Sequence, residues 1–77
     1  MNTNKNRLQV EDVARRYCTS VKAIHDRTRT NTIPHIKHRG MRRILFLERD
    51  LEAWDRGADL EVIKRQDGSR FVVPVGR

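Results

Sequence analysis

Aromatic side chains and cysteine are scarce in this sequence. Only 5% of its 77 residues are aromatic, and Cys18 is the one cysteine. A single cysteine excludes an intramolecular disulfide, which is typical of proteins from a reducing compartment. No apolar run approaches the roughly 20 residues that a membrane-spanning helix needs, and the polar residues 1–7 lack the apolar stretch of a secretory signal. We therefore expect a cytoplasmic protein with no membrane partner.

The sequence also lacks the arrangements that catalysis and metal binding require. Its carboxylates are scattered, and no spacing suggests a nucleophile beside a base. Four soft ligands are present, but their spacing matches no standard zinc pattern: Cys18, His25, His35 and His38. A chain of 77 residues buries one small core and cannot wall off a deep substrate cavity. We expect a single small domain with no enzymatic activity, no metal and no cofactor.

Positive charge is what the sequence has in excess. Lys and Arg total 17 against 10 Asp and Glu, which gives a net charge of +7 and a pI near 10.8. Residues 1–47 hold 11 of the bases and 3 of the acids, whereas residues 48–77 hold 6 bases and 7 acids. A polyanion is the natural partner of the first region. The alternative is a charged face that only keeps the protein soluble.

Two short helices are predicted in the N-terminal half. A helical pattern begins at Leu8, because Val10, Val13, Ala14 and Tyr17 recur at the spacing of one helix face.

The second helix runs roughly over residues 21–30. Thr19 or Ser20 can cap its start by accepting a bond from a free backbone N–H. Asn31 can adopt the left-handed conformation that ends a helix. Two short helices joined by a turn of about three residues form a helix-turn-helix unit.

A β-hairpin is predicted over residues 35–46. The Ile33-Pro34 step cannot continue a helix, since the residue before proline is pushed to extended geometry. Polar and apolar residues then alternate on both sides of Gly40, which we place at the tip of the turn. The tip carries three arginines with no acid nearby in the sequence: Arg39, Arg42 and Arg43. This hairpin would be a basic wing.

The rest of the chain predicts a third helix and a possible second hairpin. The helix covers residues 48–54 and places Leu51 and Trp54 three apart. Beyond Gly57, Asp67-Gly68 between two β-prone runs is a hairpin signal, and Pro74 would restrict the second strand to an edge. This tail could pack on the domain, pair with another copy or stay mobile.

Five segments, taken in order and spacing, resemble a known family. Residues 8–14 are similar to a Leu-Thr-Val-Glu-Glu-Val-Ala opening, Thr19-Ser20 to a Val-Ser turn, and Ile33-Pro34 to a Leu-Pro step. Residues 39–46 are similar to a Gly-Arg-Arg-like run with an apolar strand, and residues 50–54 read Asp-Leu-Glu-Ala-Trp letter for letter. These pieces are typical of the excisionase and MerR-like helix-turn-helix family.

The resemblance covers residues 8–54 and has three departures. Cys18 stands where the family has a turn glycine, Arg27-Thr28 where it has an apolar pair, and Asn31 where it has a glycine. No long dimerisation helix follows, unlike in a MerR sensor. The resemblance implies an α+β winged helix-turn-helix over residues 8–56, with a disordered basic arm before it and a C-terminal extension over 57–77.

The resemblance also nominates the residues that meet DNA and those that form the core. The recognition helix would present Ser20, Val21, Lys22, His25, Asp26 and Arg29 to the major groove. The wing would present Lys37, His38, Arg39, Gly40, Arg42 and Arg43, and the arm Lys5 and Arg7. The predicted core is Leu8, Val13, Ile24, Ile36, Ile44, Phe46, Leu51 and Trp54. The alternative is that these charged residues are only solvated, with Asp26 pairing with Arg29.

The function implied by the resemblance is that of an excisionase, or recombination directionality factor. Several copies would bind double-stranded DNA cooperatively beside an attachment site and bend it, so that an integrase assembles the excision complex. Removing residues 58–77 would then abolish cooperative loading and leave single-site binding. Two alternatives remain open: a transcriptional regulator of phage or mobile-element genes, and an adaptor whose basic face docks an acidic protein.

Overall fold

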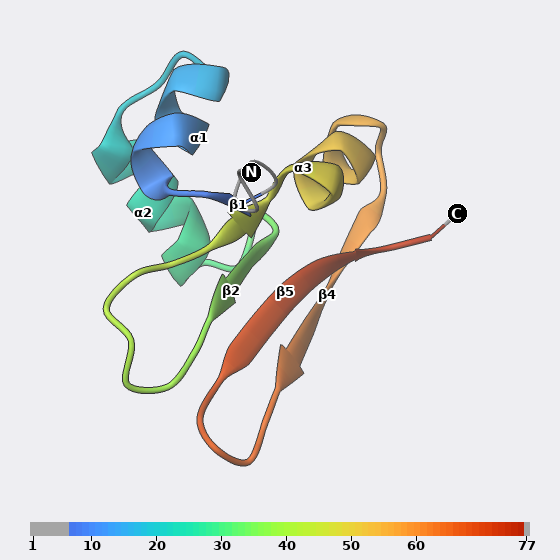
Figure 1. Ribbon diagram of the computed structural model, residues 1–77. Coiled ribbons are helices and arrows are strands. Elements are labelled where there is room, and N and C mark those ends of the chain that lie inside the picture. Colours follow the sequence, from blue (N-terminus) through green and yellow to red (C-terminus); the bar gives the residue numbers. More distant parts are fainter. Residues whose placement is uncertain (1–6, 77) are drawn as a thin grey trace, which may run out of the picture.

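A computed structural model describes residues 7–76 of the chain (Figure 1). The described part is a small α+β domain with three helices and two antiparallel sheets. In order, its elements are β1 (Arg7–Leu8), α1 (Val10–Arg16), α2 (Val21–Arg29), β2 (His35–Lys37), β3 (Phe46–Leu47), α3 (Glu48–Asp55), β4 (Asp59–Lys64) and β5 (Arg70–Val75).

The helices lie close to where the sequence predicts them. α1 begins two residues after Leu8, where the Asp12 carboxylate accepts a hydrogen bond from the Gln9 backbone N–H at 3.0 Å. The turn to α2 passes through Cys18 in a left-handed conformation (φ 54°). The left-handed Asn31 (φ 58°) follows the end of α2, as predicted.

The predicted boundary of the basic arm is wrong. Arg7 and Leu8 form β1, which pairs antiparallel with β3 through Arg7–Leu47 and Leu8–Phe46. Pairing satisfies the backbone groups of Leu8, and its side chain packs against the core. Leu8 therefore belongs to a strand and not to the first helix. Lys5 lies outside the described residues.

The main core lies between the three helices and β3. Its buried members are Val13, Ala14, Ile24, Ile33, Phe46 and Leu51, and Leu8, Val10, Tyr17, Ile44 and Trp54 pack around them. Seven of the eight predicted core residues are in these two sets, whereas Ile36 is half-buried in β2. The rings of Tyr17 and Trp54 meet edge to face at 5.7 Å, which joins α1 to α3.

The predicted two-stranded wing does not form as a tight hairpin. Residues 35–46 are joined across the turn by the single bridge between Ile36 and Leu45, and residues 38–44 form a wide loop. The strand partner of β2 is instead β5, with His35 opposite Val72 and Lys37 opposite Arg70. The residues near Gly40 thus have no ladder, because the sheet that holds β2 is completed by a strand far along the chain.

The C-terminal hairpin predicted around Asp67-Gly68 is confirmed. β4 and β5 pair along their whole length, from Asp59–Val75 to Lys64–Arg70. The expectation that Pro74 confines its strand to an edge is wrong, because β5 is the central strand in the order β2-β5-β4. β2 reaches only as far as Val72, so the missing N–H of Pro74 costs no bond to it.

Candidate nucleic-acid interface

α2 is anchored by its two buried residues. Ile24 and Thr28 are 1% and 3% exposed, and the Thr28 hydroxyl donates a hydrogen bond to the His25 carbonyl at 2.7 Å. This satisfies the hydroxyl at the position where the resembled family has an apolar residue, while the neighbouring Arg27 is exposed. The helix start is capped by Ser20, whose Oγ accepts from the Ala23 N–H at 3.1 Å.

The opposite side of α2 presents the predicted recognition residues to solvent. Ser20, Val21, Lys22, His25 and Arg29 are exposed, and Asp26 is half-buried between two bases. The Asp26 carboxylate pairs with Arg29, as the sequence predicted, and also lies 3.5 Å from Lys22 Nζ. Exposed pairs of this kind contribute little to stability, so these two bases can exchange Asp26 for another anion.

Residues 38–44, which we call the basic loop, hold the second group of predicted residues. Gly40 has a positive φ of 82°, and the Met41 N–H donates to the His38 carbonyl at 3.2 Å, which turns the chain. Arg42 and Arg43 are exposed. Among the ion pairs of residues 7–76, none involves a base of the basic loop or Lys37.

Contacts with the turn between β4 and β5 divide the basic loop. The Arg39 backbone N–H donates to Ser69 Oγ at 3.2 Å, and its guanidinium lies 3.4 Å from the Asp67 carbonyl oxygen. The His38 ring meets Phe71 edge to face at 5.6 Å. An acidic residue, Asp67, therefore lies beside the predicted wing, although residues 39 and 67 are distant in sequence and no local pattern indicates it. Arg39 is held by this turn, whereas Arg42 and Arg43 project beyond it.

The free arginines of the basic loop meet α2 at one cleft. A cleft of about 270 Å³ is lined by Gln9, Val10, Glu11, His25, Arg42, Arg43 and Ile44. It brings one predicted recognition residue of α2 and two predicted wing residues to the same opening. In Figure 1, α2 and the basic loop lie on the same side of the molecule, away from α3. Glu11 is the acidic residue of this lining, and sequence analysis assigned it only to the first turn of α1.

The remaining predicted contacts are placed less favourably. Lys37 is half-buried in β2, opposite Arg70. Arg7 is exposed, but it lies in β1 rather than in an arm. Nothing is described for Lys5, which precedes the described residues.

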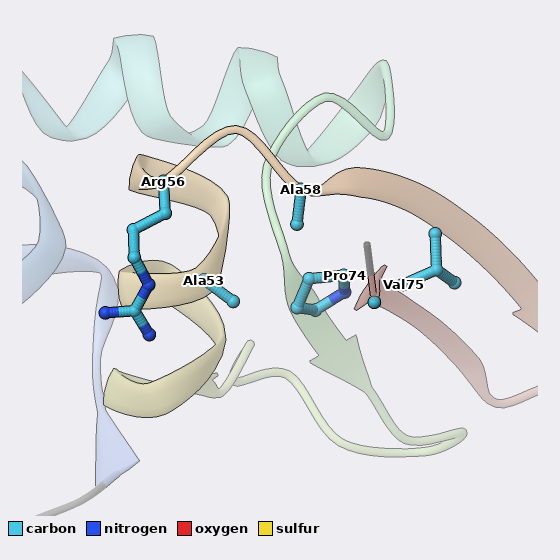
Figure 2. Close-up of a pocket in the computed structure, with 6 residues that line it drawn as sticks. Ala53, Arg56, Ala58, Pro74 and Val75 are labelled. Atoms are coloured by element: carbon cyan, nitrogen blue, oxygen red, sulfur yellow. The ribbon is translucent and has the colours of Figure 1, made fainter.

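A larger hollow of about 460 Å³ lies elsewhere, between α3 and the end of β5 (Figure 2). Its lining is mostly apolar or small, with Arg56 as the charged member: Ala53, Arg56, Ala58, Pro74, Val75 and Gly76. None of these is a residue that the sequence singled out for DNA. The lining contains no acid, imidazole, hydroxyl or thiol that could act as a base or a nucleophile.

Comparisons with protein families, with curated proteins and with solved structures found no match to this chain. Within residues 7–76, no three side chains among His, Cys, Asp and Glu come together in a group that could hold a metal ion. No helix in this described range is long and apolar enough to cross a membrane.

Proposed function

We propose that this chain binds double-stranded DNA through α2 and the basic loop, and that it acts as an excisionase-type architectural factor. The observation that carries the proposal is the cleft where His25 meets Arg42 and Arg43. Bases from two elements face the same opening, and the arginines have no acidic partner within the described part of the chain. Phosphate is the anion that such an arrangement suits best.

The proposed binding mode follows from the dimensions of duplex DNA. A helix fits the major groove, where Lys22 and Arg29 can contact phosphate or guanine. The basic loop then lies over the neighbouring backbone, where Arg42 and Arg43 can enter the minor groove. Cap formation leaves Ser20 at the start of α2, beside backbone N–H groups that favour an anion.

The architectural role rests on the sequence resemblance together with this surface. One small module neutralises only a few phosphates, so specific loading needs several copies side by side. Bent DNA lets each copy contact more backbone, which offsets the energy of bending. In this role the chain supplies no chemistry, and the partner recombinase, an integrase, carries out strand exchange.

Fluorescence anisotropy with a labelled duplex tests the DNA-binding surface. The double variant R42A/R43A should bind at least about tenfold more weakly at low salt, and its salt dependence should fall by about two phosphate contacts. The control R49A/R56A removes the same charge from α3, where both arginines are exposed, and should bind close to wild type. Equal losses in both variants would reduce the effect to net charge and overturn the proposed surface.

A second experiment separates the architectural role from its alternatives. A preferred sequence is first selected from a random duplex library, then tested by gel shift and by FRET between dyes at the two duplex ends. A ladder of bands with rising FRET supports cooperative bending. A single band without bending favours a transcriptional regulator, and no binding at about 0.15 M salt favours the acidic-protein adaptor.

A further inference from the structure

β4 is the free edge of the three-stranded sheet. One of its sides pairs with β5 at every residue, and in the order β2-β5-β4 no strand of the described part covers its other side. An uncovered edge carries unpaired backbone N–H and C=O groups that can accept a further strand.

The backbone groups on this edge are identified by the hydrogen bonds of its neighbours. The Arg65 N–H donates to the Ser69 carbonyl at 2.9 Å, so that alternate β4 residues from Ile63 back to Asp59 bond to β5. The exchange between Ile36 and Leu45 gives the same alternation from the other side of the sheet. The outward groups are therefore those of Leu60, Val62 and Lys64.

The middle of this edge is apolar and accessible. Val62 is 40% exposed and Ile63 is 39% exposed, although both are large aliphatic side chains in a strand. Successive strand residues point to opposite faces, so each face of the sheet has one exposed aliphatic side chain at this edge. Strands like this are usually protected by a charge at the centre or by a covering segment.

Charge along β4 runs from acid to base. Asp59 and Glu61 lie in its first half, while Lys64 and then Arg65 lie at its end. A second copy in the antiparallel direction brings the acidic half of each strand opposite the basic half of the other. A parallel copy would bring like charges together. The strand is thus complementary to itself in one direction only.

We propose that β4 pairs antiparallel with β4 of a second copy, about a two-fold axis at Val62. This register uses all three outward residues, since Val62 faces its own counterpart and Leu60 faces Lys64 of the other copy. Each of these pairs exchanges two backbone hydrogen bonds. Asp59 then lies opposite Arg65 of the other copy. The pairing joins two sheets into one and does not rest on DNA binding.

Sedimentation equilibrium of the full chain without DNA tests the pairing. Samples run from about 5 µM to about 500 µM, the range in which a small interface associates. Wild type should show a monomer–dimer equilibrium. V62K should weaken dimerisation by about tenfold or more, because two lysines meet at the axis. I63K, a matched change on the neighbouring residue, should retain or strengthen it, because residue 63 faces Glu61 of the other copy.

Three outcomes would overturn the proposal. A wild-type chain that stays monomeric at the highest concentration excludes self-pairing and leaves the edge to a different extended peptide. Equal weakening by V62K and I63K indicates a general apolar contact, and no effect of either places the interface elsewhere. Circular dichroism checks that each variant folds. Since DNA is absent, failure here leaves the proposed DNA-binding surface untouched.

Hydrogen exchange gives an independent measurement on wild type. The amides of Leu60, Val62 and Lys64 should exchange more slowly as concentration rises, whereas those of Glu61 and Ile63 are already bonded to β5 and should change little. Protection that rises at all five amides alike, or at none, would contradict the register.

Discussion

The His35 ring nitrogen Nε2 lies 3.3 Å from Nη2 of Arg70, which links β2 to β5. On the other side of the ring, Nδ1 lies 2.7 Å from the Ile33 carbonyl oxygen. Because a guanidinium only donates and a carbonyl only accepts, the ring is assigned as neutral, with its hydrogen on Nδ1. Burial lowers the pKa of His35, the positive charges of Arg70 and Lys37 lower it further, and the Ile33 carbonyl opposes them.

The free energy of unfolding should depend on His35 in mildly acidic solution. The pKa of His35 is lower in the folded chain than the value near 6.5 in the unfolded chain, so the unfolded chain takes up the proton first. The contribution is fully present above about pH 6.5 and declines as pH falls toward the folded pKa. Urea unfolding between about pH 7.5 and pH 5 measures this decline.

Two histidine variants identify the source of the decline. H35N keeps a donor near the Ile33 carbonyl and removes the titrating ring, so its unfolding free energy should vary less with pH. H25Q removes an exposed histidine and should retain the wild-type dependence. A decline that disappears in H25Q, or that is unchanged in H35N, would contradict the assignment.

Cys18 is strained by its backbone conformation. A left-handed φ of 54° costs a non-glycine residue roughly 1–2 kcal/mol, and glycine pays part of this back in the entropy of the unfolded chain. C18G should therefore stabilise the fold by roughly 0.5–1 kcal/mol. C18A removes the same thiol but keeps the strain, so it should leave the urea midpoint nearly unchanged. Equal effects of the two variants would show that backbone strain is not the cause.

Asp26 should oppose DNA binding. Its carboxylate neutralises Lys22 and Arg29 on the exposed side of α2 and would itself be repelled by phosphate. D26N should tighten binding to duplex DNA several-fold and steepen its salt dependence, with less than about 1 kcal/mol lost from stability. E52Q changes the net charge equally on the exposed part of α3 and should have a smaller effect in the same anisotropy assay. Weaker binding by D26N would instead make Asp26 a direct contact.

Removing residues 58–77 should destabilise the whole sheet rather than trim a tail. β5 contains the fully buried Val72 and the Arg70 partner of His35, and without it β2 retains only the bridge from Ile36 to Leu45. We expect a loss of more than about 2 kcal/mol in thermal or urea unfolding. This replaces the earlier expectation that single-site binding survives the truncation. A truncated chain that unfolds like wild type would show that the sheet is dispensable.

The sequence was sufficient wherever the decisive contacts are local. The cap at Ser20, the left-handed Asn31 and the turn at Asp67-Gly68 each depend on a few neighbouring residues, and all three are found. The 3.6-residue period likewise located α1, α2 and α3. The buried positions Val13, Ile24 and Leu51 followed from the same period.

The sequence was insufficient where a strand chooses its partner. Nothing near His35 indicates that β2 pairs with residues 70–72 instead of folding back along the basic loop. The neighbourhood of Asp67 and Arg39 depends on that same choice. For the candidate site, sequence alone identified the exposed bases of α2 and the basic loop. It did not indicate that Arg39 is occupied while Arg42 and Arg43 are free.

The central position of β5 also sets the order in which the chain can fold during synthesis. The ribosome makes β2 first, then β4, and makes β5 last, although β5 is the strand that both others need. His35 must therefore wait for Val72 before its sheet exists, while the helices around Val13 and Leu51 can already associate. Until then β2 and β4 are unpaired strands in a nascent chain. A chaperone that holds exposed strands would meet this protein at that stage.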